Sequence, residues 1–152
     1  MGFIGWVTLL ICLFVGATSF FSVNSNALRV FSRVRLQEAF KTAAGEERPE
    51  LVEKVVQIAD RLILACAFYR LVFNMGALLL MVALMGTLHT ELTPADYLIA
   101  FVASLAIFSV FSLAIPYAWA KYAGETLISR TYWILAAFTA AAAPILYILQ
   151  LY

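Results

Sequence analysis

Residues 71–90 read LVFNMGALLLMVALMGTLHT and contain no Asp, Glu, Lys or Arg. Three further stretches, residues 1–28, 97–120 and 131–152, also lack these charged residues. About 20 apolar residues in a helix that rises ~1.5 Å per residue match a hydrocarbon core about 30 Å thick. Each stretch can therefore cross a membrane or lie deep in it, and the pattern predicts an all-α integral membrane protein.

The composition supports the same class of protein. Of the 152 residues, 64% are hydrophobic and 12% are charged, whereas an ordinary globular domain has roughly 45–50% apolar and 25% charged residues. A soluble enzyme is excluded on this ground. The net charge of +1 lacks the basic excess of a nucleic-acid-binding protein, so nucleic acid is not an expected partner. We interpret residues 1–152 as a single membrane domain whose main surroundings are the lipid bilayer.

The basic residues are concentrated in one part of the chain and predict its orientation. Eight of the ten Lys and Arg residues lie between Arg29 and Arg70, whereas residues 86–96 contain none. By the positive-inside rule, residues 29–61 face the cytoplasm and the N-terminus lies outside. A cleavable signal peptide has its basic residues before its apolar core, and here Arg29 comes after it, so the first stretch should remain as a span. We expect a multi-pass protein of the cell membrane.

Start and stop signals divide the chain into helices. Residues 29–61 carry helical apolar spacing, with a break expected at Gly45 and a new helix at Pro49 that runs into the second span. The run Thr93–Asp96 offers an N-cap Thr, a Pro at the first helical position and an acidic capping-box partner. A third span should begin there and end near Lys121. The prediction is three transmembrane helices and two cytoplasmic juxtamembrane helices.

The last apolar stretch, residues 131–152, has two interpretations. Its length permits a fourth span, although Pro144 interrupts it and the small residues 136–143 favour close helix contact. The aromatic residues Tyr132 and Trp133 are equally typical of a helix that lies flat at the interface. The sequence leaves both interpretations open.

The polar residues of the spans are the candidates for a functional site. Ser22 and Asn24 lie in the run TSFFSVNSN, residues 18–26, and Asn74 follows Arg70 by one helical turn in the second span. Hydroxyl and amide oxygens are ligands that Mg²⁺ or Na⁺ accept, but the set lacks a carboxylate. The alternatives are a hydrated helix end for residues 18–26 and an Arg70 side chain that reaches the cytoplasmic interface.

Motifs of enzyme catalysis are missing from the sequence. There is no Ser-His-Asp order, no carboxylate pair within an apolar stretch and no Gly-rich phosphate loop. The single histidine, His89, lies near Glu91 and Asp96 without the spacing of a metal site. We therefore expect a protein that is not an enzyme.

Two motifs resemble the membrane domain of the CorC/CNNM (cyclin M) family. Residues 20–28 (FFSVNSNAL) and 31–36 (FSRVRL) resemble its first motif, F-F-S-x-S-E-x-A-L followed by S-R-x-R-L. Residues 116–120 (PYAWA) resemble its later P-K-x-x-A stretch. The resemblance implies three spans, an extracellular N-terminus, cytoplasmic helices around the spans, and dimerisation. It also implies transport of divalent cations, chiefly Mg²⁺ exchanged against Na⁺.

The chain departs from the family pattern where the family handles ions. Ser25 stands where the family has Glu, and Leu113 stands where the third motif, G-E-x-x-P-K, has its acid. Asn24 replaces a Ser, Asn74 falls one place late against the second motif, and Arg70 adds a positive charge. The family's nucleotide-binding CBS modules have no counterpart in these residues.

The resemblance therefore implies a divalent-cation transport domain with an impaired ion site. Ser22, Asn24 and Asn74 would hold Mg²⁺ or Na⁺ weakly, and no other cofactor is expected. The partner would be a second copy of the chain or a fuller family member that supplies the missing carboxylates. The alternative is a structural or regulatory membrane subunit that transports nothing.

Overall fold

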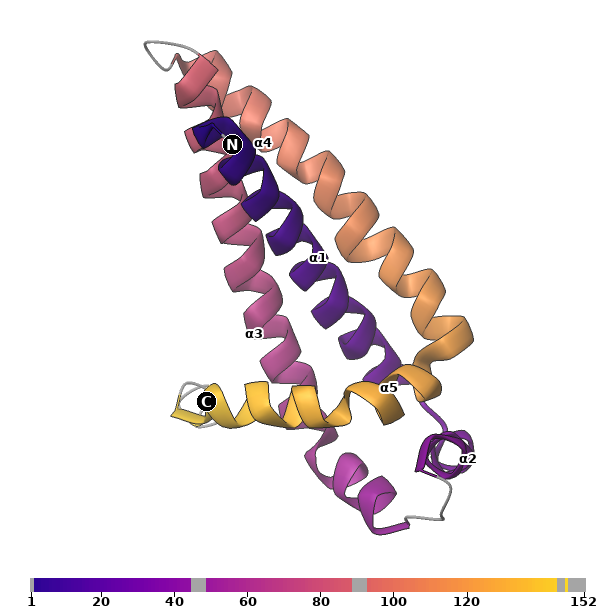
Figure 1. Ribbon diagram of the computed structural model, residues 1–152. Helices are drawn as coiled ribbons and strands as arrows, with labels where there is room; N and C mark the ends of the chain where they lie inside the picture. The colour runs from indigo at the N-terminus through magenta and orange to yellow at the C-terminus, as the bar shows by residue number, and fades with distance from the viewer. Residues whose placement is uncertain (1, 45–48, 89–92, 145–146, 148–152) are drawn as a thin grey trace.

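The computed structural model describes residues 2–44, 49–88, 93–144 and 147 (Figure 1). Within these ranges the chain is helical and contains no strand, which confirms the all-α prediction. The elements are α1 (Phe3–Val30), α2 (Arg33–Ala44), α3 (Pro49–Leu88), α4 (Pro94–Phe108), the π-helix η1 (Ser109–Ala114) and α5 (Ile115–Ala141).

In the part of the chain that the structure describes, three helical stretches are long and apolar enough to cross a membrane: Phe3–Val30, Glu50–Thr87 and Pro94–Ala141. Their side chains are mostly exposed, as expected for helices that lipid surrounds. The protein is therefore a multi-pass membrane protein with three candidate spans.

The helix starts follow the sequence signals. α3 begins at Pro49 and continues without a break into its apolar half, as predicted. At the start of α4, one carboxylate oxygen of Asp96 accepts hydrogen bonds from the backbone N–H of Thr93, at 2.8 Å, and from its hydroxyl, at 2.7 Å. The Asp thereby holds the first turn of the predicted third span. Gly45 and His89 lie outside the described residues.

A kink in α5 answers the question that the sequence left open about the last apolar stretch. Ala123 has a non-helical backbone, with φ −135° and ψ 18°. The third span ends at this kink, close to the predicted end at Lys121. Beyond it, α5 turns and runs across the lower end of α1 and across the middle of α3, whose first turns continue below the crossing (Figure 1). As far as Ala141 the segment has the arrangement of an interfacial helix and not of a fourth parallel span.

The close approach of α5 to α1 depends on two small residues. A Cβ atom placed on Gly124 would lie 3.3 Å from Cβ of Ala27, which is tighter than ordinary contact. Both residues are buried. The absence of a side chain at Gly124 thus lets α5 cross directly over the end of α1.

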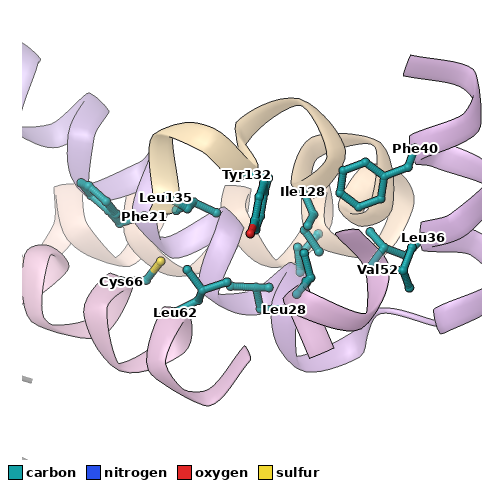
Figure 2. Close-up of a cluster of buried hydrophobic side chains, with 13 residues drawn as sticks. Phe21, Leu28, Leu36, Phe40, Val52, Leu62, Cys66, Ile128, Tyr132 and Leu135 are labelled. Atoms are coloured by element: carbon teal, nitrogen blue, oxygen red, sulfur yellow. The ribbon is translucent and has the colours of Figure 1, made fainter. Parts of the chain in front are cut away.

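The largest hydrophobic core lies where α5 crosses the other helices (Figure 2). It joins side chains from four helices: Phe21 and Leu28 of α1, Leu36 and Phe40 of α2, Leu62 and Cys66 of α3, and Ile128, Tyr132 and Leu135 of α5. The Tyr69 hydroxyl of α3 also donates a 3.1 Å hydrogen bond to the carbonyl of Phe138. The crossing segment is therefore an integral part of the fold.

A second, smaller core lies toward the other end of the spans. Val7, Ile11 and Val15 form one buried stripe of α1 that packs against side chains of α3 and α4: Leu80, Met81 and Leu84, and Ile107 and Phe108. α1 thus contacts α3 in both cores.

Candidate functional site

The polar run of α1 lies inside the protein. Thr18, Ser22 and Asn24 are fully buried, and Ser25 is 3% exposed. A hydrated helix end would leave these side chains open to water. Their burial in an apolar bundle instead requires internal hydrogen bonds or leaves unpaired polar atoms at a free-energy cost.

Ser22 finds its partner in the π-helix. Its hydroxyl donates a hydrogen bond to the backbone carbonyl of Ser112. In a regular α-helix that carbonyl would accept from residue 116, but Pro116 has no N–H. The proline thus leaves the Ser112 carbonyl without its α-helical donor, and the Ser22 hydroxyl binds it. π-helical turns of this kind are frequent at functional sites.

Asn24 uses both ends of its amide group. The Thr131 hydroxyl donates a hydrogen bond to Oδ1 of Asn24 at 2.7 Å, and Nδ2 of Asn24 donates one to the carbonyl of Phe20 at 2.9 Å. Because Thr131 lies beyond the kink, this pair links α1 to the crossing segment of α5. Asn24 therefore has protein partners for both its oxygen and its nitrogen.

Three other polar atoms are buried without a hydrogen-bond partner among the described residues. They are Oγ1 of Thr18 in α1, Oδ1 of Asn74 in α3 and Oγ of Ser104 in α4. Thr18 and Ser104 are 0% and 3% exposed. Each unpaired oxygen costs about 1–3 kcal/mol in a buried position. Native proteins rarely keep such atoms without a bound water, ion or functional reason.

Helix register places the three unpartnered oxygens at nearly one height in the bundle. The Phe14 ring contacts the Phe73 ring, with centroids 5.3 Å apart, so Asn74 lies opposite the region between Phe14 and Thr18. The bond from Ser22 to Ser112 sets the height of α4, where Ser104 comes two turns before Ser112. The three oxygens then fall within about one helical turn, ~6 Å, along the axis.

The same register places the three oxygens on inward faces. Thr18 continues the buried stripe that ends at Val15, and Asn74 precedes Met81 by two turns on the same face. Ser104 comes one turn before Ile107 and Phe108. These four neighbouring positions all belong to the small core between α1, α3 and α4, and the three oxygens therefore continue it.

The chemistry available at this height is that of neutral oxygens. The chain has no Asp or Glu in residues 1–30, 61–88 or 97–114. Among the described residues, no group of three or more His, Cys, Asp or Glu side chains could hold a metal ion. Hydroxyl and amide oxygens can accept water or Na⁺, whereas Mg²⁺ sites in proteins normally include a carboxylate.

Of Ser25 and Leu113, which align with acids in the motifs that this sequence resembles, only one is buried. Ser25 is buried, whereas Leu113 is 61% exposed and its neighbour Ser112 is buried. A carboxylate at position 113 would therefore point out of the bundle. Arg70 is half-buried, and no hydrogen bond joins it to Ser22 or Asn24, whose partners are described above.

The three residues predicted from sequence do not share one partner. Ser22 and Asn24 are two positions apart on α1 and bond to η1 and α5 respectively, while Oδ1 of Asn74 is unpaired. Thr18, Ser104 and Thr131 were not predicted as site residues. A proline four residues after Ser112 was the one sequence signal that could have indicated a free carbonyl there.

No family model matches this sequence, and no curated protein matches it. The likeness to the CorC/CNNM membrane domain therefore rests on the residues quoted from the chain itself.

Proposed function

We propose that this protein is a membrane domain of the CorC/CNNM type of divalent-cation transport, with a cation site that lacks its usual carboxylates. The observation that supports this proposal is the set of unpartnered oxygens of Thr18, Asn74 and Ser104 inside the three-span bundle. A bound water or cation there would recover the free energy that three unpaired buried oxygens cost.

The charge of the site determines which ion it can hold. Mg²⁺ gives up its water reluctantly and usually keeps several water ligands beside one or two carboxylates. Neutral oxygens do not compensate for that loss of hydration in a membrane. We therefore expect this chain alone to bind Mg²⁺ more weakly than millimolar, and to hold Na⁺ or water more readily.

A single isosteric substitution tests the proposal. Asn74→Asp keeps Oδ1 in place and exchanges the amide nitrogen for a second carboxylate oxygen. If Oδ1 of Asn74 faces the other unpartnered oxygens, the added charge should raise Mg²⁺ affinity at least about tenfold, as carboxylates do in Mg²⁺ sites. Titration calorimetry of the purified chain in neutral detergent measures the affinity.

A matched control separates the site from the general effect of charge. Gln57→Glu makes the same amide-to-carboxylate change at an exposed position of α3 outside the apolar half. It should leave Mg²⁺ binding at the level of the unmodified chain. Millimolar or tighter binding by the unmodified chain, or equal gains in both variants, would contradict the proposed incomplete site.

One observation favours the alternative, a structural or regulatory subunit that transports nothing. The hydrogen bonds of Ser22 and Asn24 have protein partners, so these residues can serve to fasten α1 to η1 and α5. Mg²⁺ and Na⁺ flux into proteoliposomes decides between the two functions. A flux that Asn74→Asp changes supports the transport domain, and the absence of flux in both proteins supports the structural subunit.

Orientation and assembly belong to the same proposal. The concentration of Lys and Arg in residues 29–61 favours a cytoplasmic position for α2 and the start of α3, with the N-terminus outside the cell membrane. The family resemblance favours a homodimer, or a heterodimer with a fuller relative that contributes carboxylates to the site.

A further inference from the structure

A pocket of about 530 Å³ lies at the corner where α1 ends, α2 begins and α5 turns. Three of its lining residues are cations, Arg29, Arg35 and Lys121, and one is an acid, Glu125. The kink at Ala123 forms this corner, since Lys121 precedes it and Glu125 follows it. The lining charges sum to +2 at neutral pH.

The cations of this pocket have no acidic partner. Among the described residues, Arg29, Arg35 and Lys121 form no ion pair, and Glu125 forms none either. The Lys121 ammonium lies over the ring of Tyr122, 6.0 Å from its centroid, in a cation–π arrangement. Three unpaired cations around one cavity leave their hydrogen-bond donors available to an anion, and Arg side chains match a phosphate bidentately.

The position of the pocket relative to the spans indicates where the anion comes from. Next to it the third span ends in strongly exposed aromatic residues, Tyr117, Trp119 and Tyr122. Exposed Trp and Tyr at the end of a span are typical of the boundary between hydrocarbon and headgroups. The unpaired cations therefore lie at the height of lipid phosphates.

The rest of the lining is apolar and suits the lipid part of a ligand. Val30, Phe31 and Ala120 line the cavity beside the cations, together with Ala27 and Gly124, where α5 crosses α1. A free phosphate ion would gain nothing from these groups, whereas the glycerol and first methylenes of a phospholipid would bury against them. The pocket thus combines an anion site with an apolar wall.

We propose that this pocket binds the phosphate group of an anionic phospholipid, with Arg29, Arg35 and Lys121 as the phosphate ligands. A lipid bound there would contact α1, α2 and both sides of the α5 kink at once. It would thereby stabilise the crossing segment against the end of the spans. The proposal does not depend on the cation site between α1, α3 and α4, because the two sites share no residue.

Binding of radiolabelled ligands to the immobilised full chain in neutral detergent tests this inference. The probes are short-chain phosphatidylglycerol, short-chain phosphatidylcholine and inorganic phosphate. We expect saturable binding of phosphatidylglycerol, with binding of the other two at least about tenfold weaker because each lacks either the net charge or the apolar part. Equal binding of inorganic phosphate would overturn the lipid as the source, and equal binding of phosphatidylcholine would overturn the charge-based site.

Two triple variants that each remove three positive charges test whether the lipid binds in this pocket. The pocket variant combines Arg29→Gln, Arg35→Gln and Lys121→Gln, and should weaken phosphatidylglycerol binding about tenfold or more. The control variant combines the same types of change at exposed positions outside the pocket: Lys54→Gln, Arg61→Gln and Arg130→Gln. It should bind nearly as well as the unmodified chain. Equal losses in both variants would show general attraction to a basic surface and overturn the site.

A variant that is expected to bind more tightly provides a test whose result misfolding cannot imitate. Glu125→Gln removes the one negative charge of the lining and should tighten phosphatidylglycerol binding about threefold, because a like charge near the phosphate disappears. A misfolded protein would not bind more tightly. Unchanged or weaker binding in a folded Glu125→Gln variant would overturn the placement of the phosphate in this pocket.

Discussion

Replacement of Thr131 by Val removes a hydroxyl and keeps the shape of the side chain. The Thr131 hydroxyl lies 2.8 Å from the carbonyl of Leu127 in its own helix and donates at 2.7 Å to Oδ1 of Asn24, a residue that is fully buried. The variant leaves that oxygen unpaired, at a cost of about 1–3 kcal/mol, whereas hydrogen bonds between membrane helices average about 0.6 kcal/mol. Because both residues pack in the apolar crossing of α1 and α5, we expect a loss of about 1–2 kcal/mol in the free energy of unfolding.

The assay is reversible unfolding in mixed detergent micelles, followed by the fluorescence of the chain's tryptophans. The control is Thr139→Val in the same helix, since the Thr139 hydroxyl donates at 2.8 Å to the carbonyl of Leu135 within α5. That change should cost less than about 0.5 kcal/mol, because the carbonyl keeps its helical partner. Equal losses in the two variants, or a double-mutant cycle with Asn24→Leu that gives no coupling, would refute the reasoning.

Three further predictions concern topology, packing and assembly. In a background without native cysteines, an impermeant maleimide should label Ala95→Cys but not Thr42→Cys in intact cells, and the reverse pattern would contradict the orientation. Gly16→Ala should raise the free energy of unfolding by up to about 1 kcal/mol, because its Cβ meets nothing within 4 Å. Gly76→Ala should not raise the free energy of unfolding, since the added Cβ would collide with the ring of Phe14. Crosslinking in native membranes should trap a dimer, and a monomer alone would contradict the proposed assembly.

The helices could be predicted from sequence because their signals are local. Charge-free stretches of bilayer length marked the spans, Pro49 marked the start of α3, and Thr93 with Asp96 marked the start of α4. No local sequence pattern of this kind indicated the kink at Ala123. It coincides with the close crossing of Gly124 over Ala27, which joins residues about 100 positions apart in the sequence. Packing of this kind leaves no periodic trace in a single sequence.

The candidate site was predicted only in part for the same reason. The sequence drew attention to Ser22, Asn24 and Asn74 as polar residues in apolar surroundings. Whether a buried oxygen is paired depends on tertiary partners, and Thr131 lies 107 residues after Asn24. The unpartnered oxygens of Thr18 and Ser104 belong to residue types that commonly bond within their own helix, so the sequence could not distinguish them from packing residues.

The unpartnered oxygens allow a test in which stability and function change in opposite directions. Thr18→Val removes an unpaired buried hydroxyl at constant shape, so it should raise the free energy of unfolding by about 1 kcal/mol. Introduced beside Asn74→Asp, it should also reduce the gained Mg²⁺ affinity about fivefold or more, because one oxygen ligand is lost. Ser109→Ala is the control, since the Ser109 hydroxyl donates to the carbonyl of Leu105 at 2.8 Å and is exposed.

A structural role and a cation site predict different results for this pair of measurements. If Thr18 serves packing alone, Thr18→Val stabilises the protein and leaves the affinity of the Asn74→Asp variant unchanged. If Thr18 and Asn74 face a common ion, the two substitutions are coupled in Mg²⁺ binding although no hydrogen bond joins their side chains in the structure. We expect Thr18→Val to stabilise the protein against unfolding and to be coupled to Asn74→Asp in Mg²⁺ affinity. The buried hydroxyl oxygen of Thr18 costs free energy when the site is empty and lowers the free energy only when it coordinates an ion.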